Sequence, residues 1–156
     1  MSLAKALVVY DSVFGNTEKV ARFLAWGLES GGVSAEVVKA DSVKFDELKK
    51  FDLLCVGTPV HAWGVSEPVK DFLEHLQSVE GLAGKKAFAF DTKMKSRLAG
   101  SAGGKIERKL KDLGMTIVKH SESAVVLGRE GPLEESAEGR FKQIGVELAK
   151  ISEVHS

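Results

Sequence analysis

The chain has 156 residues, of which 44% are hydrophobic and 28% are charged, with 22 basic and 22 acidic side chains. This length fits one domain over residues 1–156, and the balanced charge argues against a general nucleic-acid-binding protein. A single cysteine excludes an internal disulfide and a metal site made of several thiolates. No apolar run reaches the roughly 18 residues of a membrane helix, and no signal peptide is visible. We therefore expect a cytoplasmic protein with no membrane span.

Apolar runs alternate with helical patterns along the whole chain. Runs typical of buried strands lie at residues 6–10, 35–38, 51–56, 87–90 and somewhere within 115–127. Apolar residues at helical spacing follow each of them, at residues 20–28, weakly at 42–50, and then at 69–76, 106–113 and 141–151. Five strand–helix repeats predict an α/β fold, namely a single doubly wound domain whose parallel sheet carries helices on both faces.

Ligands of such a sheet bind beyond the carboxyl ends of its strands, where residues 11–16, 58–66 and 91–104 are expected to lie. The first of these segments joins a strand directly to a helix. Its free backbone N–H groups at the positive end of the helix dipole suit a phosphate. Ser12, Asn16 and Thr17 can add neutral side-chain donors, and Gly15 lets the backbone approach a phosphate closely. A helix start without any ligand has a similar composition, so both interpretations stay open.

The second segment contains Trp63, whose flat indole suits an aromatic ligand; packing on a helix surface is the alternative. His61 either flanks a ligand or is an exposed loop histidine. No G-x-G-x-x-G follows the first strand, and residues 99–106 lack residues that a nucleotide P-loop requires, which argues against both nucleotide motifs. We expect Gly103 and Gly104 to form a flexible entry to a helix.

Two motifs resemble those of flavodoxins. Ser12-Val13-Phe14-Gly15-Asn16-Thr17 resembles the phosphate loop Ser/Thr-x-Thr-Gly-Asn-Thr of that family, and Gly-Thr-Pro-Val-His-Ala-Trp-Gly at residues 57–64 resembles its second loop. The resemblance covers the whole chain and implies a flavodoxin-like fold of the short-chain type, with a five-stranded sheet in the order 2-1-3-4-5 and FMN as cofactor.

The resemblance also implies where FMN lies. The phosphate is expected on the first loop, and the isoalloxazine ring between the second loop and a loop that starts at Asp91. The implied cofactor-binding residues are Ser12, Val13, Phe14, Gly15, Asn16, Thr17, Thr58, Pro59, Val60, His61, Ala62, Trp63, Gly64, Asp91, Thr92 and Lys93.

Three features depart from the family pattern. Phe14 replaces a hydroxyl residue of the phosphate loop, the third loop lacks a tyrosine to cover the outer flavin face, and the chain is neutral where flavodoxins are typically acidic. Residues 85–111 hold nine basic and two acidic side chains, a net charge of +7. Within them Lys93, Lys95 and Arg97 are expected to border the flavin and to attract an anionic partner or ligand.

Three functions remain under consideration. The resemblance implies an FMN-binding electron-transfer protein that serves redox partner proteins. The alternative is an NAD(P)H-dependent, FMN-containing reductase of quinones or other small, anionic acceptors, which the open third loop and its cations favour. A flavodoxin-like module without flavin is the third, favoured by the missing tyrosine and hydroxyl. A phospho-accepting receiver domain is disfavoured, because Gly57 and Thr58 stand where the strand should end in aspartate.

Overall fold

One parallel sheet organises the molecule. The computed structural model describes residues 4–60, 64–95 and 102–152. Its strands run in the order β2-β1-β3-β4-β5, with β6 also paired to β4, which confirms the predicted order. The strand bounds are β1 Lys5–Tyr10, β2 Ser34–Lys39, β3 Leu53–Pro59, β4 Lys86–Met94, β5 Thr116–Ile117 and β6 Glu122–Val126.

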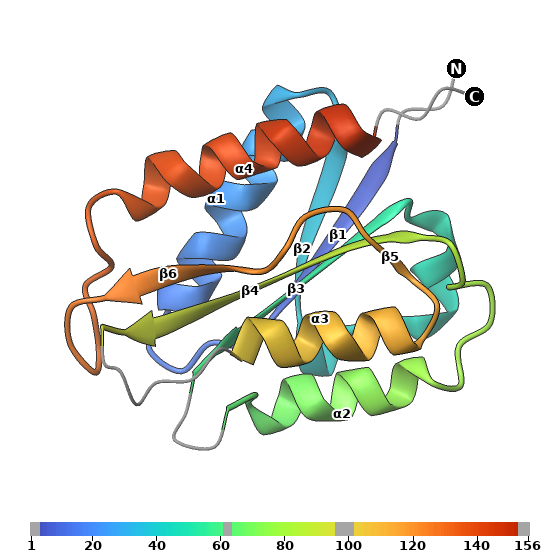
Figure 1. Cartoon of the computed structure of the whole chain (residues 1–156), viewed down its shortest axis with the longest axis horizontal. Helices are drawn as coiled ribbons and strands as arrows, with labels where there is room; N and C mark the ends of the chain where they lie inside the picture. The colour runs from blue at the N-terminus through green and yellow to red at the C-terminus, as the bar shows by residue number, and fades with distance from the viewer. Residues whose placement is uncertain (1–3, 61–63, 96–101, 153–156) are drawn as a thin grey trace.

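Two pairs of helices cover the two faces of the sheet (Figure 1). The helices α1 (Asn16–Ser30) and α4 (Ala137–Ser152) lie on one face, and α2 (Glu67–Leu76) and α3 (Ala102–Asp112) lie on the other. Side chains alternate across a strand, so Phe88 and Phe90 of β4 enter the core under α1 and α4, while Ala87 and Ala89 face α2 and α3. Each face of the sheet therefore has its own apolar core.

The helices α1 and α4 pack against each other through two glycines. A Cβ atom added to Gly27 would overlap the carbonyl oxygen of Lys142, and one added to Gly145 would overlap the carbonyl oxygen of Leu24. A side chain at either position would force the helices apart. This close contact fixes α4, and with it the chain segment that precedes α4 at the carboxyl edge of the sheet.

The link between β2 and β3 corrects the prediction of a helix over residues 42–50. Two short 3₁₀-helices form there, at Ala40–Ser42 and Phe45–Lys50, and no α-helix. Phe45, Leu48 and Phe51 contribute to the core beside α2. Their spacing of three residues matches the 3₁₀ period rather than the α-helical one. The prediction of an α-helix after every strand was therefore wrong at this position.

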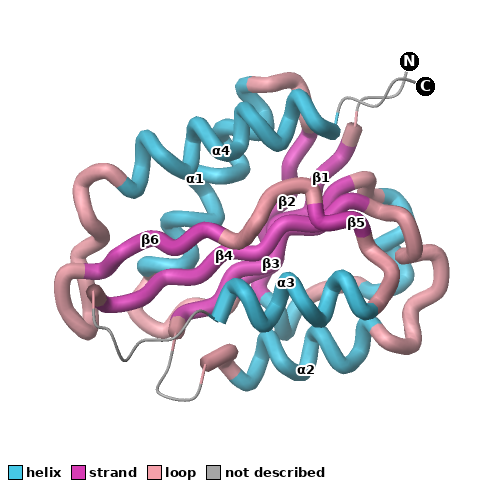
Figure 2. Tube along the Cα trace, in the orientation of Figure 1, coloured by secondary structure: helices cyan, strands magenta, loops and turns pink. Residues whose placement is uncertain are grey.

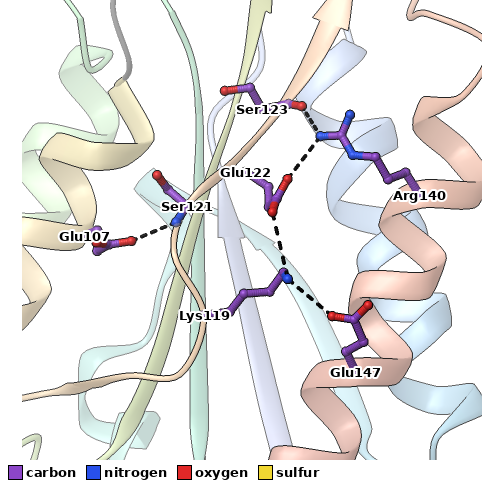
Figure 3. A network of polar contacts seen from close by, with 7 residues as sticks. All are labelled: Glu107, Lys119, Ser121, Glu122, Ser123, Arg140 and Glu147. Atoms are coloured by element: carbon purple, nitrogen blue, oxygen red, sulfur yellow. Dashed lines mark hydrogen bonds and ion pairs between the residues drawn. The ribbon is translucent and has the colours of Figure 1, made fainter.

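The fifth predicted strand, placed somewhere within residues 115–127, is two strands. Both β5 and β6 pair with β4, at its start and at its end respectively, and residues 118–121 between them belong to neither strand (Figure 2). The polar stretch at residues 119–123 causes this interruption, because side chains of α3 and α4 form hydrogen bonds and ion pairs with it (Figure 3).

Contacts from two helices hold this interruption. On the α3 side, Glu107 accepts a hydrogen bond of 2.7 Å from the backbone N–H of Ser121. On the α4 side, Lys119 Nζ lies 3.3 Å from a carboxylate oxygen of Glu147, and Arg140 donates to a backbone carbonyl of β6. These contacts set the position at which β6 begins, and so where its carboxyl end meets the other strands.

The strand β4 is longer than predicted. It pairs with β3 as far as Thr92 and with β6 as far as Met94. Asp91, Thr92 and Lys93 therefore lie within a strand, and the prediction of a loop that starts at Asp91 was wrong. Pairing on both sides continues the backbone ladder beyond the apolar run from which the strand end was predicted.

Candidate functional site

A cavity of about 420 Å³ lies at the carboxyl ends of β1, β3, β4 and β6. This volume falls within the range of about 300–1,000 Å³ typical of ligand sites. The residues that line the cavity are Ser12, Val13, Phe14, Asn16, Thr17, Pro59, Val60, Thr92, Lys93, Met94, Val126 and Arg129. The first nine of them were predicted as site residues, so the structure brings these together from three separate segments.

The junction between β1 and α1 forms one wall of the cavity. Gly15 has a φ of 90°, a left-handed conformation that glycine adopts without strain, and its N–H donates to Ser12 Oγ over 3.0 Å. No side chain caps α1, which begins at Asn16. The first N–H groups of a helix have no partner within it, so this junction can receive an anion.

Hydrogen bonds between side chains tie the junction to its neighbours. Thr17 Oγ1 lies 2.7 Å from Thr92 Oγ1 of β4, and both residues are buried. Asn16 Nδ2 donates to the carbonyl oxygen of Glu130 over 3.1 Å. The backbone N–H of Val60 donates to the carbonyl oxygen of Thr92 over 2.8 Å, which brings the end of β3 to the same point. These hydrogen bonds hold the β1–α1 junction, the end of β3 and the end of β4 together around the cavity.

Three lining residues were not predicted, namely Met94, Val126 and Arg129. Met94 lies within the segment 91–104 that was expected at the ligand edge, but the residues assigned to the cofactor there ended at Lys93. Val126 and Arg129 follow the carboxyl end of the fifth predicted strand, which the general rule for parallel sheets places beside the other ligand-binding loops. The turn signal Gly128-Arg129-Glu130-Gly131 at that position was the available clue.

The cavity has an apolar mouth and two cations. Val13 and Phe14 are 57% and 47% exposed, and Met94 is exposed as well. Neither Lys93 nor Arg129 forms an ion pair with an acidic side chain in the described ranges 4–60, 64–95 and 102–152. Both cations can therefore attract a negatively charged ligand.

Asp91 lies apart from the cavity lining. Its side chain is fully buried, and Oδ2 accepts a hydrogen bond of 2.8 Å from the N–H of Gly103. Burial raises the pKa of the Asp91 carboxyl above its ordinary value of 3.8, while this hydrogen bond opposes the shift. Gly103, predicted in a flexible entry to the helix, lies instead in the first turn of α3. Asp91 thus occupies the N-terminal end of α3 from within the protein.

Thr58 and Gly64 hold the ends of the second loop. Thr58 is fully buried, and its Oγ1 accepts a hydrogen bond of 3.1 Å from the N–H of Ser66 at the start of α2. Gly64 has a φ of 99°, and a Cβ atom there would lie 2.8 Å from Lys105 Nζ. Neither residue lines the cavity. His61, Ala62 and Trp63 lie outside the described residues.

The family model for flavodoxins matches residues 8–144 of this chain. The chain therefore belongs to the flavodoxin family, whose members bind FMN.

Particular relatives are similar in sequence or in structure. An NAD(P)H dehydrogenase (quinone) of Sinorhizobium fredii is 32% identical over 111 residues, and a probable flavodoxin 1 of Bacillus subtilis is 29% identical over 91 residues. Each alignment covers 56% of this chain and 56% of the relative, so the match spans little more than half the length of either curated protein. A flavodoxin from the domain Archaea superimposes with a TM-score of 0.82 at 26% identity, covering 96% of this chain and 99% of that one.

The hydrogen-bond donors at the β1–α1 junction are of the kind that binds the phosphate of FMN. The β1–α1 junction offers helix N–H groups and the Ser12 hydroxyl beside a cavity of cofactor size, and Gly15 keeps side-chain atoms away from the backbone there. None of the helices in the described part of the chain is long and apolar enough to span a bilayer.

Proposed function

We propose that this protein is an FMN-dependent electron carrier that exchanges electrons with redox partner proteins. The observation that carries the proposal is the open β1–α1 junction, which shares one cavity with an exposed apolar mouth. Bound FMN supplies one- and two-electron redox chemistry, and the protein supplies binding, orientation and electrostatics.

The chain's own residues divide this work. The N–H groups at the start of α1 bind the phosphate, and the buried Thr17–Thr92 pair fixes that wall against β4. Val13, Phe14 and Met94 surround the mouth with apolar surface, which limits water there and gives a partner protein an area to contact.

The second loop is proposed to contact the ring. Trp63, outside the described residues, follows lining residues Pro59 and Val60 in the chain. A stacked aromatic pair contributes about 0.5–1.5 kcal/mol beyond area burial, so Trp63→Ala should weaken FMN binding by up to about tenfold and shift the reduction potentials. An unchanged affinity together with unchanged potentials would place the indole away from the ring.

An absorbance spectrum of the purified protein is the first test. We expect flavin bands, one FMN per chain on titration of the apoprotein, and reduced protein that passes electrons to a partner while NADPH alone is consumed slowly. Failure to bind any flavin would contradict the proposal and favour a flavodoxin-like interaction module.

A reductase of small acceptors is the second candidate. The specific observation in its favour is that Lys93 and Arg129 lie in the cavity lining and form no ion pair among the described residues, so they can attract an anionic acceptor. The quinone dehydrogenase of S. fredii, at 32% identity, adds support. Steady NADPH oxidation in the absence of a partner protein would favour this candidate over the carrier.

Reoxidation kinetics test the role of the cations. We expect an anionic quinone to reoxidise the reduced protein faster than a neutral one of similar potential, with a rate that falls as salt screens charges over about 10 Å at 0.1 M. Lys93→Glu/Lys95→Glu should remove this salt dependence and leave the neutral quinone unaffected. A double variant that behaves like the parent in stopped flow would assign both lysines to an ordinary solvated surface. Arg97, which was predicted beside them, lies outside the described residues.

A further inference from the structure

A hairpin after β6 reaches the cavity from the far end of the chain. We call residues 126–133 the Arg129 hairpin. Its stems are joined by a hydrogen bond of 2.8 Å from the N–H of Leu127 to the carbonyl oxygen of Pro132, and its tip by one of 3.1 Å from Gly131 to Gly128. The hairpin therefore has a defined shape of its own, and Arg129 lies in its turn.

The start of α1 sets the position of this hairpin. Asn16 Nδ2 donates to the carbonyl oxygen of Glu130, a contact between residues 114 positions apart. Gly131 has a φ of 116°, and a Cβ atom there would lie 3.0 Å from Asn16 Oδ1. The hairpin thus packs on the first residue of α1 with no space for a side chain between them.

The same contacts engage side chains of the β1–α1 junction, and none of the side chains from Ser12 to Thr17 carries a positive charge. The amide of Asn16 is engaged by Glu130, the hydroxyl of Thr17 is paired with Thr92, and Phe14 has no polar group. A phosphate monoester carries a charge of about −1.5 to −2 near neutral pH. Backbone N–H groups and Ser12 are neutral, so within the junction itself that charge meets no cation.

Arg129 is placed to supply this cation. It lines the cavity together with Ser12, Phe14 and Thr17, and it forms no ion pair with acidic groups in the described parts of the chain. We propose that the Arg129 hairpin brings a guanidinium to the phosphate of FMN, so that recognition of the phosphate in this protein depends on a charge from the β6–α4 connection. The inference rests on the proposed binding of FMN.

Titration of the apoprotein with FMN and with riboflavin tests the inference. Charge-assisted hydrogen bonds are roughly twice as strong as neutral ones, so Arg129→Gln should weaken FMN binding by about tenfold. Riboflavin, which lacks the phosphate, should bind the variant as it binds the parent. The FMN affinity of the variant should also depend less on salt than that of the parent, because one screened attraction is gone.

Lys19→Gln is the matched control. It removes an equal charge from an exposed position of α1 that does not line the cavity, and FMN affinity should change less than twofold by the same screening argument. Gly131→Ala is a second variant, which displaces the hairpin while keeping Arg129. Gly131→Ala should weaken the binding of FMN and leave the binding of riboflavin unchanged, as is expected for Arg129→Gln.

The outcomes separate this inference from the proposed function. A parent that binds neither flavin would contradict both. A parent that binds FMN, with Arg129→Gln weakening FMN and riboflavin equally or leaving both unchanged, would overturn the role of Arg129 and leave the electron carrier standing. If Lys19→Gln weakens FMN binding as much as Arg129→Gln does, the loss of affinity comes from net charge alone. That result would also overturn the inference.

Discussion

Two strand-to-helix junctions lie at the same edge of the sheet and treat their helix N-termini in opposite ways. At the β1–α1 junction no side chain caps the helix, Gly15 takes a left-handed conformation, and a cavity adjoins. At the β4–α3 junction the buried carboxylate of Asp91 accepts the N–H of Gly103. One junction can receive an anion from outside, whereas the other already contains a buried carboxyl group of the protein itself.

Topology alone therefore does not select the binding site. Both helices present the positive end of their dipole at the carboxyl edge of the sheet. The Asp91 carboxyl group occupies the N-terminal end of α3 and accepts the N–H of Gly103, so an external phosphate would have to compete with it there. The open α1 end retains its affinity for an anion.

Removal of the buried carboxyl group of Asp91 should produce the largest effect. Asp91→Ala leaves the buried N–H of Gly103 without its partner, which should lower the free energy of unfolding by about 2 kcal/mol. Urea denaturation followed by far-UV circular dichroism measures this. FMN affinity should stay within about twofold of the parent, because Asp91 does not line the cavity. A stability equal to that of the parent would contradict the capping role.

The raised pKa of Asp91 should make stability depend on pH. Between 3.8 and its raised value, the folded protein holds a proton that the unfolded chain has released. The free energy of unfolding of the parent, relative to Asp91→Asn, should therefore be highest at low pH. It should fall as pH rises through the folded pKa, by at most about 1.4 kcal/mol per pH unit. A relative stability that rises over this window would mean that the carboxyl pKa is lowered by folding.

The left-handed glycine of the open junction should be needed for both shape and binding. Gly15→Ala introduces strain of about 1 kcal/mol without a clash, since no atom lies within 4 Å of the added Cβ. Gly84→Ala is the control, because its φ of 84° and open surroundings are similar but it lies in another turn. Both variants should lose similar stability in thermal unfolding, while only Gly15→Ala should weaken FMN. Equal FMN affinities would show that the junction tolerates a changed backbone.

The parts of the structure that were predictable depend on local patterns. Apolar runs and apolar residues at helical spacing predicted the order of the strands and helices. The segment from Ser12 to Thr17 was predictable as a motif because its residues are adjacent in the chain. The rule that parallel strands end at one edge then brought Pro59, Val60 and Thr92 to the same cavity.

The parts that were not predictable depend on tertiary contacts. The break between β5 and β6 arises because α3 and α4 hold residues 119–123, and no local pattern announces those partners. Arg129 reaches the cavity through a bond between Asn16 and Glu130, which are far apart in sequence. Asp91 was assigned to a loop because its strand continues only by pairing with β3 and β6.

Backbone amide chemical shifts can show which helix N-terminus meets the phosphate of FMN. Isotope-labelled apoprotein is saturated with riboflavin or with FMN, and the two spectra are compared residue by residue, so that only the effect of the phosphate remains. The open-junction account predicts the largest differences at the N–H groups of residues 13–17, with Gly103 and its neighbours in α3 unchanged. Differences centred on Ala102 and Gly103, with residues 13–17 unaffected, would contradict it.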